Sequence, residues 1–255
     1  MTEPTGTGRG QGDDPRSAEL AGRLAAVRKR IEAAAGAAGR GDRLPSLIVV
    51  TKFHPAVDIR RLAALGVRDV GENRDQEAAA KAVELADLAL TWHFVGQLQT
   101  KKAKSVARYA SAVHSVDRPQ LVDALAKAVR QEMDTSGRAP LDCFIQVSLE
   151  HATYNDDGGT HRGGAAPADV PLLAERIVGA EGLNLAGVMA VAPLGAPPEP
   201  AFETLAGISA RLAAAYPSAT AISAGMSQDL EAAVKFGATH LRIGSDILGS
   251  RPAVG

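Results

Sequence analysis

Eight short apolar runs, separated by longer segments of helical periodicity, constrain the fold of this 255-residue chain more than any other feature. The runs lie at residues 47–51, 67–71, 91–96, 112–116, 143–149, 185–191, 220–224 and 240–244. Amphipathic stretches lie between them, at 57–65, 74–88, 99–109, 120–133, 170–179, 202–216 and 228–236. This alternation is typical of parallel strands joined by crossover helices.

The number of repeats distinguishes two α/β architectures. Eight β–α units in about 250 residues fit a closed barrel better than an open doubly wound sheet. One more helical segment, at 16–38, precedes the first run, and the chain ends shortly after the eighth. We therefore predict an α/β fold, a single (β/α)8 TIM barrel over residues 16–255 with an extra N-terminal helix, preceded by a flexible tail at 1–15.

Charge and cysteine content narrow the class of partner. The net charge of −1 lacks the basic excess that nucleic-acid or anionic-membrane binding requires. Cys143 is the only cysteine, which excludes an intrachain disulfide and fits a reducing cytoplasm. No signal segment or long apolar span is present. We expect a cytoplasmic monomer that binds a small molecule, without nucleic-acid or membrane partners.

Polar residues follow the first, seventh and eighth runs, at the end where barrels place their functional loops. Lys52 follows the first run; such a lysine is most often simply solvated, but a neutral amine there would attack an aldehyde. Ser227 is expected to cap a helix that starts at Gln228. Together with Gly244 and Ser245 after the eighth run, it predicts a phosphate site of hydroxyl and N–H donors.

Arg242 lies inside the eighth run. If Leu241 and Ile243 pack outward, the period-two alternation of a strand directs Arg242 into the barrel, where a guanidinium needs an acceptor. The acceptor is either a buried carboxylate or the ring nitrogen of a bound pyridine.

Other features allow two interpretations each. The long connections 151–169 and 193–200 act either as lids or as plain surface loops. Asn73, with Gln76 three residues later, has the pattern of a helix capping box. His93, His114 and His240 lie in predicted strands, but without metal-ligand spacing they are expected to be core or pocket histidines, and we predict no metal.

Six segments, in this order, resemble the pyridoxal phosphate homeostasis protein family. They are VTK at 50–52, GEN at 71–73 with QE at 76–77, WHFVGQLQ at 92–99, GVM at 187–189, SAGMSQD at 223–229 and RIG at 242–244. Two departures, TKK at 100–102 and alanine at 224, do not touch the proposed phosphate donors.

The resemblance implies a barrel similar to the N-terminal domain of alanine racemase, with pyridoxal 5'-phosphate as the cofactor. It assigns the Schiff base to Lys52 and the pyridine nitrogen to Arg242. It assigns the phosphate to Ser227, Gly244 and Ser245, and the lining of the pocket to Asn73 and Ser223.

The same residues favour a carrier over a catalyst. Pyridoxal phosphate enzymes usually place a carboxylate at the pyridine nitrogen, whereas an arginine leaves it unprotonated. Racemisation would still be possible but needs a second base, which alanine racemase takes from a tyrosine of a second domain. Tyr109 and Tyr216 belong to predicted outer helices, which leaves Tyr154.

We therefore expect a binding protein with no catalytic residues, which takes part in intracellular vitamin B6 homeostasis and passes the cofactor to pyridoxal phosphate-dependent apo-enzymes. The alternatives are a pyridoxal phosphate-dependent amino-acid racemase and a Schiff-base aldolase acting on a phosphorylated sugar.

Overall fold

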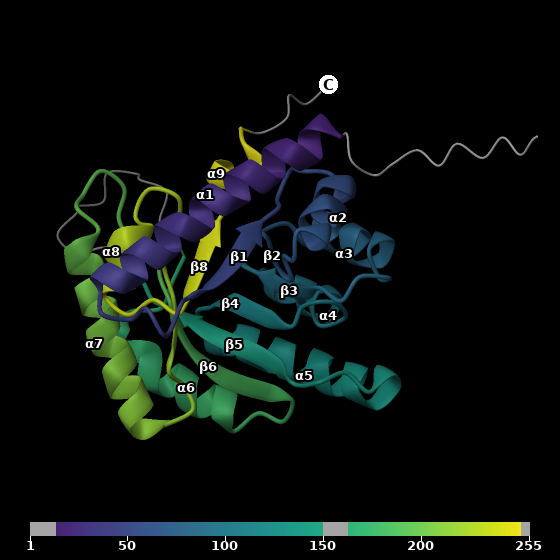
Figure 1. The fold of residues 1–255 in the computed structure, drawn as a ribbon. Coiled ribbons are helices and arrows are strands. Elements are labelled where there is room, and N and C mark those ends of the chain that lie inside the picture. The colour runs from purple at the N-terminus through teal and green to yellow at the C-terminus, as the bar shows by residue number, and fades with distance from the viewer. Residues whose placement is uncertain (1–13, 150–162, 251–255) are drawn as a thin grey trace, which may run out of the picture.

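The computed structural model describes residues 14–149 and 163–250 and contains a closed barrel of eight parallel strands. The strands are β1 (Ser46–Val50), β2 (Asp69–Glu72), β3 (Thr91–Phe94), β4 (Ala112–Val116), β5 (Leu141–Gln146), β6 (Leu183–Met189), β7 (Ala221–Ser223) and β8 (His240–Ile243). They follow one another in chain order around the barrel, and β8 pairs with β1 to close it (Figure 1). The predicted (β/α)8 architecture is confirmed.

Helices surround the barrel (Figure 1). They are α1 (Pro15–Ala37), α2 (Ala56–Ala64), α3 (Asp75–Glu84), α4 (Ala103–Val106), α5 (Pro119–Ser136), α6 (Val170–Val178), α7 (Glu199–Ala215), α8 (Leu230–Lys235) and α9 (Ser245–Leu248), with 3-10 helices η1 (Thr100–Lys102) and η2 (Pro167–Asp169). The helix predicted at 99–109 is wrong in form, because it consists of η1 followed by the single turn α4. Helix α9 was not predicted; it is one turn at the carboxyl end of β8.

The extra N-terminal helix, α1, is confirmed and packs against α2, α8 and α9, across the strands where the barrel closes (Figure 1). It begins with Asp14, whose side chain accepts a hydrogen bond from the Arg16 N–H, and with Pro15 at its first position. Its buried face consists of Leu20, Leu24, Val27, Ile31, Ala34 and Ala35. This helical spacing buries one stripe of α1 against the barrel.

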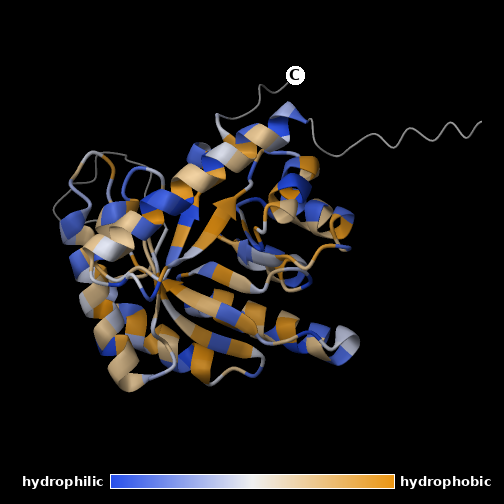
Figure 2. Cartoon of the chain, viewed as in Figure 1, coloured by the Kyte–Doolittle hydropathy of each residue, from blue (hydrophilic) through white to orange (hydrophobic). Residues whose placement is uncertain are grey.

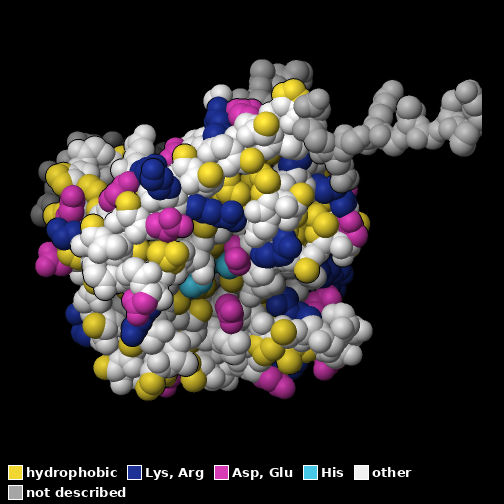
Figure 3. All heavy atoms as spheres, viewed as in Figure 1, with side chains coloured by type: hydrophobic (Ala, Val, Ile, Leu, Met, Phe, Trp, Pro, Cys, Tyr) yellow, Lys and Arg dark blue, Asp and Glu magenta, His cyan; other side chains and the backbone are white. Residues whose placement is uncertain are grey.

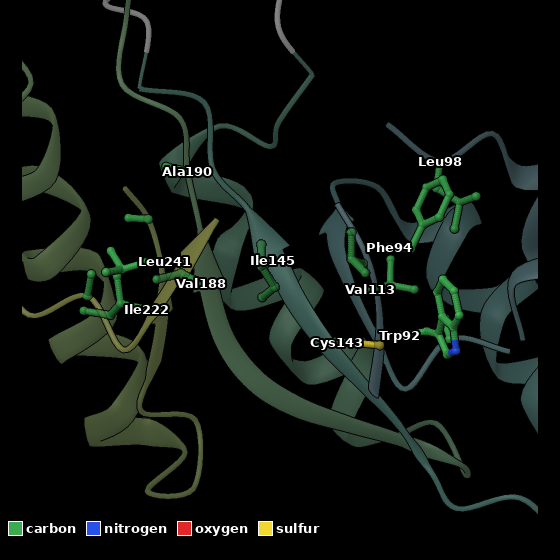
Figure 4. Packing of buried hydrophobic residues seen from close by; sticks show 14 of the residues in the cluster. Trp92, Phe94, Leu98, Val113, Cys143, Ile145, Val188, Ala190, Ile222 and Leu241 are labelled. Atoms are coloured by element: carbon green, nitrogen blue, oxygen red, sulfur yellow. The ribbon is translucent and has the colours of Figure 1, made fainter. Parts of the chain in front are cut away.

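Strand alternation divides the core into two layers. Trp92 and Phe94 on β3, and Cys143 and Ile145 on β5, belong to the large cluster between the strands and the helices (Figure 4). Phe144, between the last two, belongs instead to a small separate cluster with Ala112 and Met189. Successive side chains of a strand point to opposite faces, so this small cluster lies inside the barrel.

The hydropathy of the helices matches this arrangement, since blue hydrophilic positions alternate with orange ones along each outer helix (Figure 2). Within residues 14–149 and 163–250, no helix combines the length and the apolar character that a membrane crossing needs.

Candidate functional site

A cavity of about 700 Å³ opens at the carboxyl ends of the strands. Six of the seven predicted site residues lie on its wall: Lys52, Asn73, Ser227, Arg242, Gly244 and Ser245. Residues 193–196 and 198, from the predicted loop 193–200, line the same cavity. Residues 151–162 of the other predicted lid, and residues 1–13 of the predicted tail, lie outside the described residues.

The turn that carries Lys52 is held on both sides. Its neighbour Phe53 has a φ of 67°, a left-handed conformation that is rare for a bulky residue. The Phe53 N–H donates to Glu77 Oε1 at 2.7 Å, and the Thr51 carbonyl accepts from Lys81 Nζ at 2.9 Å. These contacts fix the direction in which the Lys52 side chain leaves β1.

The groups that hold this turn form a buried ionic cluster. Lys81 Nζ lies 2.7 Å from Glu72 Oε1 and 2.6 Å from Glu77 Oε1, and the Thr51 hydroxyl also donates to Glu72. Burial raises the pKa of Glu72, and the charge of Lys81 opposes this effect. Glu72 and Glu77 lie in the sequence segments 71–73 and 76–77 noted above, whereas Lys81 was not predicted to take part; the four-residue spacing of Glu77 and Lys81 on one helix was the available signal.

Two serines meet where phosphate binding was predicted. Ser227 Oγ and Ser245 Oγ are 3.2 Å apart, and Ser245 is the first residue of α9. A Cβ on Gly244 would lie 3.0 Å from the Val50 carbonyl oxygen, so a side chain here would crowd the backbone at the end of β1. The predicted cap is wrong, because α8 begins at Leu230 rather than at Gln228. Met226 N–H instead donates to Asp229 Oδ1, which tightens the turn before the helix.

Arg242 points into the barrel, as the alternation of β8 predicted. Its guanidinium donates to Ser223 Oγ at 2.6 Å and to the Ala190 carbonyl at 2.9 Å. Within the described part of the chain no carboxylate forms an ion pair with it. Burial lowers the pKa of Arg242 to about 10, so it is charged at neutral pH. Ser223, expected to line the pocket, is instead fully buried beneath Arg242.

Asn73 does not cap a helix. Helix α3 starts at Asp75 with Arg74 at the cap position and no side-chain cap, so the capping-box prediction is wrong. The backbone of Asn73 packs directly against Gly96. A Cβ added to Gly96 would lie only 2.7 Å from the Asn73 Cα. Asn73 Oδ1 and His54 Nδ1 are buried on this wall and have no hydrogen-bond partner among the described residues, so a ligand could satisfy these polar atoms.

The strand histidines do not form a metal site. No group of three or more His, Cys, Asp or Glu in residues 14–149 and 163–250 is placed to hold a metal ion. His93 and His114 hydrogen-bond each other inside the barrel, with 3.0 Å between Nδ1 and Nε2.

Comparison with known proteins defines the class first. The family model "Alanine racemase, N-terminal domain" matches residues 23–252. An alanine racemase from Streptomyces coelicolor shares the fold, with a TM-score of 0.71 over 92% of this chain and 59% of that one, at 17% identity. The chain therefore belongs to the class of proteins built on the barrel of the alanine racemase N-terminal domain.

More similar proteins define the family. A pyridoxal phosphate homeostasis protein from Corynebacterium glutamicum is 43% identical over 228 residues, which is 89% of this chain and 99% of that one. The structure of PipY from Synechococcus elongatus with pyridoxal phosphate bound has a TM-score of 0.73 and 32% identity, covering 90% of this chain and all of that one. The chain belongs to the pyridoxal phosphate homeostasis protein family.

Proposed function

We propose that this protein binds pyridoxal 5'-phosphate through a Schiff base to Lys52 and takes part in intracellular vitamin B6 homeostasis without substrate turnover. One observation carries the proposal. A single cavity brings together the Lys52 amine, the Arg242 guanidinium and the paired hydroxyls of Ser227 and Ser245. These are the partners that an aldehyde, a pyridine nitrogen and a phosphate require.

The cavity fits the cofactor in size and in polarity. Its volume of about 700 Å³ is within the range of small-molecule pockets, roughly 300–1,000 Å³. Ser227, Gly244 and Ser245 would hold the phosphate, because all three line the cavity and Gly244 has no side chain to cover its backbone. Arg242 would donate to the ring nitrogen, and Asn73 Oδ1 is an acceptor in need of a donor.

Binding without turnover is favoured because no tyrosine within residues 14–149 and 163–250 lines the cavity as a second base. Tyr109 packs edge-on against Trp92, and Tyr216 ends α7, so neither lines the cavity. Tyr154, the candidate base of the racemase alternative, lies outside the described residues. The similar C. glutamicum protein is named for homeostasis rather than for catalysis.

The remaining parts of the proposal concern context. Residues 16–255 would act as one cofactor-binding domain, in a cytoplasmic monomer. Cofactor would leave by exchange of the imine and pass to pyridoxal phosphate-dependent apo-enzymes. Leu194, in the loop 193–200 on the cavity wall, is 83% exposed, so the cofactor would be bound beside solvent, as such exchange requires.

The test is spectroscopic. Protein mixed with pyridoxal phosphate should develop a visible Schiff-base absorption band, and borohydride should trap the adduct on the peptide that contains Lys52. Lys52→Ala should remove both signals, and Lys104→Ala, a change of an exposed lysine on α4, should keep both. An adduct found on another lysine would refute the assignment. Amino-acid racemisation that Tyr154→Phe abolishes would support the racemase instead.

A further inference from the structure

A continuous line of hydrogen bonds runs from the cavity through the interior of the barrel. Arg242 donates to Ser223 Oγ (2.6 Å), which lies 2.8 Å from His114 Nδ1. His114 Nε2 lies 3.0 Å from His93 Nδ1, and His93 Nε2 lies 2.9 Å from Asp69 Oδ1. The five residues come from β8, β7, β4, β3 and β2, and we call them the interior chain.

The far end of the interior chain reaches solvent. Asp69 is the first residue of β2, and its side chain is 36% exposed. His93 also lines a second cavity of about 620 Å³, together with His240 and Asp142, at the amino ends of the strands. Figure 3 shows cyan histidine surfaces between magenta acidic ones in a hollow of the face that it presents. The interior chain therefore connects the two ends of the barrel.

The two ends fix the direction of every hydrogen bond between them. A guanidinium only donates, and an ionised carboxylate only accepts. If each histidine carries one proton, His93 must donate from Nε2 to Asp69 and accept at Nδ1. His114 must then donate from Nε2, and its Nδ1 accepts from the Ser223 hydroxyl. All the protons point away from Arg242.

The state of the central residue agrees with this assignment. Burial, reinforced by the nearby His93, Arg242 and His240, lowers the pKa of His114 well below its usual value, so its ring is neutral and carries one proton. The ring is also stacked on Phe144 at a centroid distance of 4.1 Å, which holds its plane.

We propose that Asp69 is a remote positioning residue for the cofactor pocket, acting through His93, His114 and Ser223 on Arg242. With the protons in this order, the lone pairs of the Ser223 oxygen are free to accept from the Arg242 guanidinium. The hydroxyl hydrogen of Ser223 points toward His114 Nδ1. The Arg242 guanidinium is then held by the Ser223 oxygen and by the Ala190 carbonyl, and its remaining N–H groups are available to the cavity.

Reversal of the hydrogen-bond direction along the interior chain would change the groups that surround Arg242. It requires either a second proton on His93 or a donor in place of Asp69. His114 would then donate to Ser223, which would already accept from Arg242, and the Ser223 hydrogen would be displaced from its buried acceptor. A competing donor would lie beside the guanidinium.

The matched variants are Asp69→Asn and Asp142→Asn. Both remove one negative charge at the amino end of the barrel, but the Asp142 side chain accepts from the Asn184 amide and, among the described residues, is not part of the interior chain. An asparagine at 69 can turn its NH2 toward His93 and allow the reverse order. Both carboxylates raise the pKa of His240, but only Asp69 contacts His93, so a difference between the variants reports on that contact.

The first readout is the ¹⁵N shifts of the histidine rings in cofactor-free protein at mildly alkaline pH. We expect His93 and His114 to carry the proton on Nε2 in the wild type and in Asp142→Asn, and Nδ1-protonated forms to appear in Asp69→Asn. A wild-type His114 protonated on Nδ1 would overturn the proposal. A loss of structure alone would not select one tautomer over the other.

The second readout rests on the proposed function. The dissociation constant for pyridoxal phosphate should rise about tenfold in Asp69→Asn, the loss expected for one charge-assisted hydrogen bond, and less than about twofold in Asp142→Asn. Equal changes in both variants would refute the positioning role. If the wild type binds no pyridoxal phosphate, the proposed function fails, while the tautomers still decide whether the interior chain is ordered as we infer.

Discussion

Replacing Lys81 by methionine tests how the turn around Lys52 is held. Lys81 is 6% exposed and is the cation beside Glu72, which is fully buried. Lys81→Met removes this charge and keeps a side chain of similar length. Removal of one partner of a buried ion pair leaves an uncompensated charge, which is strongly destabilising.

The structure bounds the size of this loss, because Glu72 can take up a proton instead of remaining charged. For a carboxyl with an ordinary pKa of 4.5 in the unfolded chain, being protonated at pH 7 costs about 3.4 kcal/mol. We expect Lys81→Met to lower the free energy of unfolding by about 3–4 kcal/mol at pH 7. The folded variant then holds one proton more than its unfolded chain, so the loss should shrink by about 1.4 kcal/mol per pH unit as the pH falls toward 4.5.

The assay is urea denaturation followed by circular dichroism at several pH values. Lys81→Met combined with Glu72→Gln should recover most of the loss, since the fully buried carboxylate is then gone and the Glu77 carboxylate is partly exposed. The exposed control Lys127→Met should stay within about 0.5 kcal/mol of the wild type. Affinity for pyridoxal phosphate should fall in Lys81→Met, because the Thr51 carbonyl loses its donor. A loss below about 1 kcal/mol at pH 7, or one that does not change with pH, would refute the reasoning.

Three further predictions concern other parts of the barrel. Gly96→Ala should destabilise the fold by about 1–3 kcal/mol and weaken cofactor binding, since the added methyl group meets the backbone of Asn73; unaltered unfolding and affinity would contradict this. Leu125 in α5 is fully buried, so Leu125→Ala should lower the free energy of unfolding, measured by chemical denaturation, by about 2–5 kcal/mol. A smaller loss would mean that neighbouring side chains move into the space that the leucine leaves. Burial lowers the pKa of His240 to about 4, so His240 should contribute a loss of at most about 3 kcal/mol of wild-type stability between pH 6.5 and 4, because the unfolded chain takes up a proton that the folded one does not. Buried His114 adds a loss of the same sign, so His240→Gln should reduce the slope without abolishing it, and an unchanged slope would contradict the role of His240.

The sequence by itself determined the barrel and the end of it that carries the site. Eight apolar runs at regular spacing leave few other architectures, and the residue after each run must lie at the carboxyl end of a strand. This placed Lys52, Gly244 and Ser245 correctly on one rim, and period-two alternation directed Arg242 inward. These inferences depend on local order along the chain, which the barrel preserves.

Predictions based on a short local pattern failed where the packing of the pocket decides the geometry. The pattern from Asn73 to Gln76 suggested a capping box, but close contact with Gly96 holds Asn73 on the cavity wall. Ser227 looked like a helix cap, but the turn closed by Met226 and Asp229 delays the helix. At Asn73 a contact from the segment after β3 outweighs a weak capping preference, and at Ser227 a competing local turn does so.

Only the tertiary structure decided which side chains meet inside the barrel. The pairing of Lys81 with Glu72 joins a helix to the preceding strand, and the interior chain from Asp69 to Arg242 draws on five different strands. Strand periodicity predicts which residues point inward, but not which of them lie at the same height along the barrel axis. That depends on the stagger between neighbouring strands when the barrel closes, and this stagger is fixed by packing around the whole circumference rather than by any one segment.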